Sequence, residues 1–200
     1  RTTWGFNIAV AYDVAASMSG IYVTGCIRTQ GLTGPYDSFV LKYDTNGNFK
    51  WERFWGGTLN DEAYGIATSE DGKWIYVAGR TQSYGAGAYD AFLLKYDKDG
   101  GLAYQKTFGG TGDDGAYGVA VVVTSVLVAG QSHGAGMNDV LLLVYDANGN
   151  LKASRTFGGS NNDEARAVAV SLSPTPVIWV VGGTYSTGAG DCDALLLKLP

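Results

Sequence analysis

The sequence has little charge, and its charged residues are not clustered. Only 16% of its 200 residues are Asp, Glu, Lys or Arg, whereas about a quarter is usual in globular domains. The net charge is −5 and the basic residues are scattered singly, which argues against a nucleic acid or an anionic membrane as partner. No apolar run approaches the length of a membrane-spanning helix.

Histidine and cysteine are also scarce. His133 is the only histidine, and no cysteine or second histidine lies near it, which argues against a transition-metal site. The glycines are distributed by repeat and form no phosphate-binding loop, and no nucleophile-elbow pattern occurs. We therefore expect no enzymatic activity. The alternative is a carbohydrate-active hydrolase or lyase that uses paired carboxylates on exposed loops.

Glycine and tyrosine are abundant, at 30 and 13 residues, and this composition favours strands joined by turns over long helices. A segment of about fifty residues recurs four times, which points to propeller blades or a repeat array. We place the units at about 1–50, 51–103, 104–152 and 153–200, within a single domain. The clearest marker of the repeat is one aspartate per unit: Asp37, Asp90, Asp139 and Asp193.

Each unit reads as four short strands, here named A to D. In the second unit they are predicted at 63–68, 74–79, 90–97 and 101–110, separated by turns rich in Asp and Gly. Strand C is apolar at nearly every position, as expected of a strand covered on both faces. Strand A alternates small and larger residues, which suits a crowded central axis. The pattern predicts an all-β fold, a β-propeller of four four-stranded blades.

The chain begins with "RTTWG", which matches the end of strand D in the other units: "RFWGG", "KTFGG" and "RTFGG". The last unit ends at "LLLKLP" and has no strand D of its own. We therefore expect the N-terminal strand to complete the last blade and close the ring, which also covers an exposed edge. The alternative is a fragment of a larger propeller, whose open blades would favour self-assembly.

The stretch "GGTLNDEAYGIATSEDGKWIYVAGRTQSYGAGAYDAFLLKYDKDGGL" resembles the SBBP repeats of bacterial and archaeal β-propellers, and the resemblance covers essentially the whole chain. It implies a propeller that is extracellular or attached to the cell surface, often within a longer protein. It implies no defined activity and no catalytic residue. The first unit departs from the pattern, because "WGFNIAVAYDVAAS" lacks the GG and DE elements.

Antiparallel strands place the D–A and B–C loops on one face, and these are the long and varied loops. We expect this face to bind a protein or a glycan. Acidic residues in the D–A loops could hold a hard cation such as Ca²⁺, or each aspartate could cap its own loop through backbone N–H groups. The candidates are Asp61, Glu62, Asp114, Asp163 and Glu164.

Aromatic residues on the same loops could stack on sugar rings, or they could pack between blades. The aromatic ligand-binding candidates are Tyr84 and Tyr185, and Tyr36 and Tyr89 lie on the same loops. His133 stands roughly where Tyr84 stands in the previous unit, so we expect it to shape the loop and count it among the ligand-binding candidates.

The aspartate that recurs in every unit is expected to be structural, because a single site would not need four copies. We expect the carboxylates of Asp37, Asp90, Asp139 and Asp193 to accept backbone N–H groups. Cys26 and Cys192 flank the B–C loops of the first and fourth units. A disulfide between them would reinforce a four-bladed ring and indicate an oxidising compartment, and the alternative is two free, buried thiols.

Overall fold

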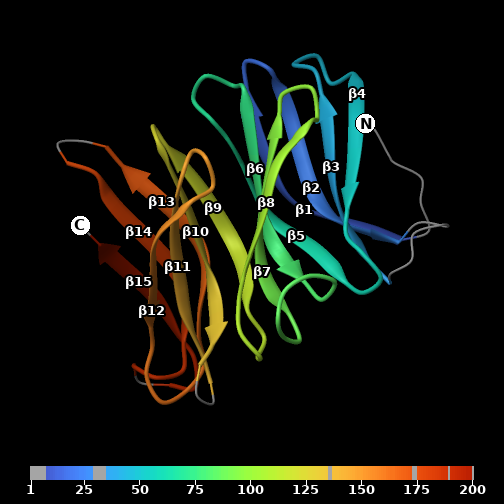
Figure 1. Ribbon diagram of the computed structural model, residues 1–200. Coiled ribbons are helices and arrows are strands. Elements are labelled where there is room, and N and C mark those ends of the chain that lie inside the picture. Colours follow the sequence, from blue (N-terminus) through green and yellow to red (C-terminus); the bar gives the residue numbers. More distant parts are fainter. Residues whose placement is uncertain (1–7, 29–34, 135–136, 173–174, 189, 200) are drawn as a thin grey trace.

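The computed structural model describes residues 8–28, 35–134, 137–172, 175–188 and 190–199, which form fifteen strands in four antiparallel sheets (Figure 1). The first sheet contains β1 (Ile8–Ser17), β2 (Gly20–Arg28), β3 (Asp37–Tyr43) and β4 (Phe49–Trp55). The second contains β5 (Asp61–Thr68), β6 (Trp74–Thr81), β7 (Asp90–Asp97) and β8 (Leu102–Phe108).

The third sheet contains β9 (Gly115–Val122), β10 (Ser125–His133), β11 (Asn138–Asp146) and β12 (Leu151–Phe157). The fourth contains β13 (Asp163–Ser171), β14 (Val177–Thr184) and β15 (Asp193–Leu199). In every sheet the strands lie in chain order, so each sheet is a meander like the predicted unit. The four strands predicted in the second unit are confirmed, and the first begins two residues earlier than expected.

The first strands of the four sheets lie next to one another. β5 packs between β1 and β9, and β9 packs between β5 and β13. The four sheets are therefore arranged side by side as blades, with one inner strand each. The all-β fold predicted from the sequence is confirmed, and the arrangement of the sheets is that of β-propeller blades.

The C–D turns begin with an aspartate that caps them. The carboxylate oxygen Oδ1 of Asp44 accepts the backbone N–H groups of Asn46 and Asn48, at 3.0 and 2.8 Å. Asp97 and Asp146 repeat this arrangement in the next two sheets. The Asp-rich turn signals in the sequence thus mark hairpins because the side chain fixes the turn.

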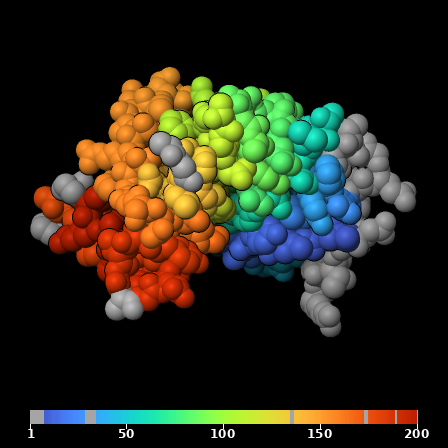
Figure 2. All heavy atoms as spheres, turned by 90° about the horizontal axis from the view of Figure 1, so that it is seen from below, coloured from blue at the N-terminus to red at the C-terminus, as the bar shows by residue number. Residues whose placement is uncertain are grey.

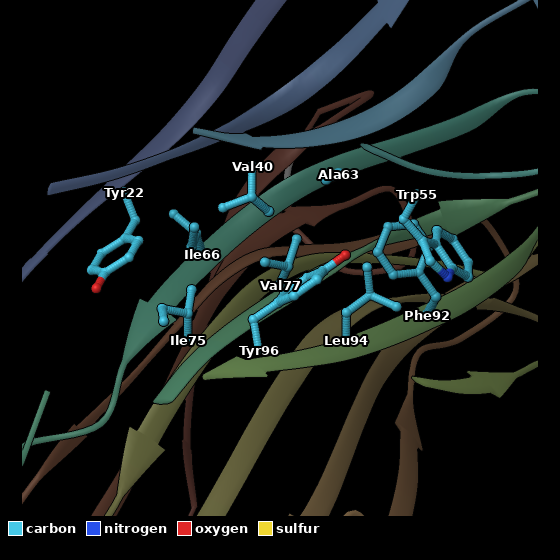
Figure 3. Packing of buried hydrophobic residues seen from close by; sticks show 10 residues of the cluster. All are labelled: Tyr22, Val40, Trp55, Ala63, Ile66, Ile75, Val77, Phe92, Leu94 and Tyr96. Carbon is cyan, nitrogen blue, oxygen red and sulfur yellow. The ribbon is translucent and has the colours of Figure 1, made fainter. Parts of the chain in front are cut away.

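The hydrophobic core is divided among the junctions between neighbouring sheets. Between the first and second sheets, Tyr22 and Val40 pack on Ile75, Val77 and Leu94, as Figure 3 shows. Similar clusters lie between the second and third sheets and between the third and fourth. The third strands of the first three sheets are largely buried on both faces as a result, which explains their continuous apolar sequence.

The described residues form an arc of four sheets, and closure of the ring is not seen among them. Figure 2 shows a notch between the first sheet, in blue, and the last sheet, in red. The predicted closing strand, residues 1–5, lies outside the described residues. Within the described ranges, no helix has the length and apolar character needed to cross a membrane.

Candidate functional site

The D–A loop aspartates are buried and bind groups of their own loops and of strand B or the B–C loop beside them. Asp61 is fully buried, and its Oδ2 atom accepts the N–H of Gly57 at 2.8 Å and the hydroxyl of Ser83 at 2.6 Å. The hydroxyl of Thr81 donates to its other oxygen. This is the capping alternative from the sequence analysis, and a carboxylate used in this way is not presented to an external ligand.

Asp114 and Asp163 repeat this arrangement. Asp114 accepts the N–H of Gly110 at 2.9 Å and the hydroxyl of Ser132 at 2.5 Å. Asp163 accepts the N–H of Gly159 at 3.0 Å and the hydroxyl of Ser186 at 2.6 Å. Both are buried, so Asp61, Asp114 and Asp163 match the capping alternative rather than the ligand-binding one.

Two of the four strand C aspartates, Asp90 and Asp193, cap their B–C loops, as expected for a structural residue. Oδ2 of Asp90 accepts the N–H groups of Ala86 and Gly87, at 3.0 and 3.2 Å. Asp193 accepts the N–H of Gly190 at 3.3 Å. Asp37 is buried at the same position in the first sheet, where the facing B–C loop includes residues 29–34, outside the described ranges. Asp139 occupies this position in the third sheet.

The two sets of aspartates meet in pairs at the junctions between sheets. In the first pair, burial and then the neighbouring charge of Asp61 raise the pKa of Asp37 to about 6. In the second, burial raises the pKa of Asp90, and the nearby Asp114 acts in the same direction. The first glycine of each GG motif lies between the two carboxylates: a β-carbon at Gly109 would collide with Asp90 and lie 2.8 Å from Asp114 Oδ2.

A β-bulge occurs at the same place in every inner strand, and sequence reasoning missed it. The register skips one residue in each: Tyr12, Tyr64, Tyr117 and Arg166. Such a bulge re-aims the side chain of the extra residue. The rings of Tyr12 and Tyr64 lie 5.0 Å apart and those of Tyr64 and Tyr117 5.3 Å apart, and the Arg166 guanidinium lies 4.9 Å from the Tyr117 ring.

A recurring glycine of strand B is the sequence signal for these bulges. A β-carbon on any of these glycines would collide with a backbone carbonyl oxygen of the bulged strand beside it, so only glycine fits. The glycines are Gly25, Gly79, Gly130 and Gly182. The bulged residues thus form one row along the inner strands, which we call the axial row: Tyr12, Tyr64, Tyr117 and Arg166.

The two glutamates predicted as ligand-binding residues are paired with arginines beside the axial row. Glu62 lies 2.6 Å from the Arg80 guanidinium and accepts the Tyr64 hydroxyl at 2.9 Å. Glu164 lies 2.5 Å from the Arg166 guanidinium. These two ion pairs offset the charges of the glutamates, which argues against a role for Glu62 and Glu164 as cation ligands.

The tyrosines of the axial row are harder to ionise than free tyrosines. Burial raises the pKa of Tyr12 to about 12, and burial also raises the pKa of Tyr64.

A polar cavity opens where the B–C and D–A loops of the third and fourth sheets meet. It measures about 400 Å³ and is lined by Met137, Asn161, Asn162, Tyr185, Gly190 and Asp191. We call it the Tyr185 cavity. Tyr185 is 49% exposed. The side-chain amide of Asn161 donates a hydrogen bond to the backbone carbonyl of Tyr185 at 2.8 Å. The predicted loop face therefore carries a cavity with one aromatic ring, two amides and a carboxylate.

The other two ring residues predicted as ligand-binding are held by contacts within the protein. Tyr84 is 39% exposed, but its ring lies 5.0 Å from that of Trp55 and its hydroxyl donates to the carbonyl of Gly56 at 2.8 Å. The ring of His133 is hydrogen-bonded to Asn138 at 2.9 Å. Both contacts match the packing and shaping roles that the sequence left open.

His133 does not correspond to Tyr84, so that part of the sequence alignment is wrong. It follows Ser132, whose hydroxyl binds Asp114 as Thr81 binds Asp61. Its counterpart in the second sheet is therefore Gln82, the residue after Thr81.

Of the two alternatives for the cysteines, the structure has free thiols, and the possible disulfide is not formed. Cys26 is buried, with its sulfur 3.8 Å from the Tyr12 hydroxyl, whereas Cys192 is exposed in the fourth sheet. The prediction required the first and fourth blades to touch, and closure of the ring is not seen among the described residues. The Ca²⁺ alternative for the acidic loops gains no support either, because no described group of three or more acidic, histidine or cysteine side chains could hold a metal ion.

Comparisons with known proteins place the chain in no family. No family model matches it. It is 31% identical over 143 residues to the regulatory protein FlaEY of Caulobacter vibrioides, and the match covers 62% of the chain and 15% of that protein. The chain thus spans a small part of this relative's length.

Two solved structures align with most of the chain. The β-propeller domain of the trilobed protease from Pyrococcus furiosus aligns with a TM-score of 0.45 and 12% identity, over 96% of the chain and 58% of that structure. An exo-1,5-α-L-arabinanase from a bovine ruminal metagenomic library aligns with a TM-score of 0.43 and 10% identity, over 93% of the chain and 72% of that structure.

Proposed function

We propose that this chain is a non-catalytic binding module that presents its D–A and B–C loops to a glycan outside the cell or at its surface. The observation that carries the proposal is the Tyr185 cavity. The extracellular location rests on the resemblance to SBBP repeats and on the acidic composition. A protein ligand on the same loop face is the second candidate, because these loops differ in sequence from blade to blade.

The chemistry of the Tyr185 cavity suits a sugar. An exposed tyrosine ring offers a flat apolar face for the C–H groups of a pyranose, while amides and a carboxylate offer donors and acceptors for its hydroxyls. Asn161, Asn162 and Asp191 supply these polar groups around Tyr185. The volume of about 400 Å³ lies within the range of small-molecule sites.

The buried carboxylates favour binding over catalysis. A raised carboxyl pKa in a concave site would indicate a general acid, and the pKa of Asp37 is raised to about 6. Its counterpart Asp90 is shifted in the same direction by the same causes. The raised pKa thus recurs at two successive junctions, on the Asp37 and Asp90 side chains, which are only 2–3% exposed. A shift that repeats on buried side chains matches a structural role.

The proposal is tested by titrating ¹⁵N-labelled chain with neutral and acidic oligosaccharides and following the backbone amide signals. We expect shifts at Asn161, Asn162 and Tyr185, and an affinity at least tenfold weaker for Tyr185→Ala, the loss expected from one hydrogen-bonding aromatic contact. Gln82→Ala is the matched control, because Gln82 follows Thr81 as Tyr185 follows Thr184.

Two outcomes would contradict the proposal. If the chain cleaved any oligosaccharide in the panel, it would be a carbohydrate-active enzyme, which is the alternative function. A titration in which the Tyr185→Ala and Gln82→Ala variants both bind as the unmodified chain does would remove the Tyr185 cavity from the function.

A further inference from the structure

Each sheet has a forward face, turned toward the next sheet in the chain, and a backward face, turned toward the previous one. On the forward face of the second sheet, Tyr76, Ala78 and Leu93 are no more than 2% exposed. They pack against Val126 and Val128, on the backward face of the third sheet. The described junctions thus show which surface a forward face takes as its partner: the backward face of a blade of the same kind.

The forward face of the fourth sheet has no such partner among the described residues. Its residues at the positions of Tyr76, Ala78 and Leu93 are Trp179, Val181 and Leu196. Val181 is 42% exposed and Leu196 is 61% exposed. The same apolar positions that are buried at the inner junctions therefore form an open apolar face here.

The backward face of the first sheet is open as well. Ile21 and Val23 occupy the positions that Ile75 and Val77 occupy in the second sheet. Ile75 and Val77 are fully buried, whereas Ile21 and Val23 are only partly buried. Ile21 and Val23 line an apolar groove of about 470 Å³. Among the described residues, one forward face and one backward face thus lack a neighbouring sheet, and these are the two halves of a junction.

A lysine on strand C links neighbouring sheets at two of the three described junctions. The ammonium group of Lys42 donates to the carbonyl of Lys98 in the C–D turn of the second sheet, at 2.6 Å. Lys95 donates in the same way to the carbonyl of Ala147 in the third sheet, at 2.6 Å. In the third sheet this position is taken by Val144, and that junction has no such contact.

The fourth sheet repeats the lysine without its acceptor. Lys198 follows Leu197 as Lys95 follows Leu94, and its ammonium group lies 5.5 Å from the centre of the Trp179 ring. The position of Lys98 and Ala147 corresponds in the first sheet to Thr45, the residue after the capping Asp44. A forward face on the fourth sheet with this lysine thus matches a backward face that offers the Thr45 carbonyl.

We propose that a second copy of this chain docks head to tail, with the forward face of the fourth sheet of one copy on the backward face of the first sheet of the other. Lys198 then donates to the Thr45 carbonyl of the second copy, as Lys95 donates to Ala147 within the chain. Two copies joined in this way at both ends form a closed ring of eight blades, within the range of four to eight that propellers use. A head-to-tail contact whose rotation closes gives a ring and not a filament.

The test is the mass of the 200-residue chain in solution, by light scattering and sedimentation velocity at about 100 μM. We expect a dimer, and we expect Leu196→Glu and Val23→Glu each to shift it to monomer, because a buried unpaired carboxylate opposes the interface. Leu102→Glu is the matched control, since Leu102 is 45% exposed on the outer strand of the second sheet and lies on neither of the two open faces, which belong to the first and fourth sheets. Circular dichroism checks that each variant is folded.

Mixing the two variants distinguishes head-to-tail docking from a symmetric contact. Leu196→Glu retains the backward face of the first sheet and Val23→Glu retains the forward face of the fourth, so their mixture should recover a dimer. A monomeric unmodified chain at this concentration would overturn the proposal. So would a dimer that persists in both single variants, or a mixture that stays monomeric.

Discussion

The carboxylates of Asp90 and Asp114 meet beside Gly109, where a β-carbon would lie 2.8 Å from Asp114 and still closer to Asp90. One aspartate caps the B–C loop of the second sheet and the other caps the D–A loop that leads into the third. The two loops can approach only because no side chain separates the carboxylates. The GG motif of the repeat therefore serves the junction between blades.

Substitution of the two glycines of one motif should separate this packing effect from any general effect of alanine. Gly109→Ala forces a methyl group between two buried carboxylates, so we expect a loss of about 1–3 kcal/mol in the free energy of unfolding. Gly110→Ala meets nothing within 4 Å and should change it by less than about 0.5 kcal/mol. Urea unfolding of both variants gives the comparison, and equal losses would contradict it.

Asp37 should make the chain less stable as the pH rises. Its pKa is about 6 in the folded chain, above the ordinary value for an aspartate, so between pH 4 and 6 the folded chain holds a proton that the unfolded chain has lost. The free energy of unfolding therefore falls through this window, by about 3 kcal/mol at most. Asp37→Asn has no such proton and should lack this part of the dependence.

Urea unfolding of the unmodified chain and Asp37→Asn from pH 2 to pH 7 measures the difference. Asp71→Asn is a control of opposite sign, because hydrogen bonds from the Ser69 hydroxyl and the Lys73 N–H lower the pKa of Asp71 to about 2. The stability contributed by Asp71 is present above its ordinary pKa and is lost as the pH falls toward 2. A difference between the unmodified chain and Asp37→Asn that is constant with pH would contradict the shift.

The strands were predictable from local sequence, whereas the contacts between them were not. Turn aspartates such as Asp44 act on residues within four positions, so their pattern marks hairpin ends. The pairing of Glu62 with Arg80 depends instead on the register across β5 and β6. The sequence left a Cys26–Cys192 disulfide open for a larger-scale reason: the bond depends on the rotation between successive blades, which no local sequence pattern specifies.

Lys95 should contribute to stability through the junction between the second and third sheets. It is 7% exposed, and its ammonium group donates to Ala147 and lies 4.0 Å from the centre of the Trp74 ring. Burial lowers its pKa, so desolvation offsets part of the gain. We expect Lys95→Met to cost about 1 kcal/mol. The exposed Lys50, paired with Asp44, is the control, and Lys50→Met should cost less than about 0.5 kcal/mol; equal costs would argue against the contact.

The two cysteines should differ sharply in their reactivity. Burial raises the pKa of the Cys26 thiol, so at pH 7.5 little thiolate is present and access to it is poor, whereas Cys192 is exposed. Because the thiolate is the reactive form, brief treatment of the folded chain with iodoacetamide should add one label, and treatment after unfolding without reductant should add two. Cys192→Ser should take up no label while folded. If the unmodified chain took up no label even after unfolding, the two thiols would be bonded and the free cysteines of this structure would be wrong.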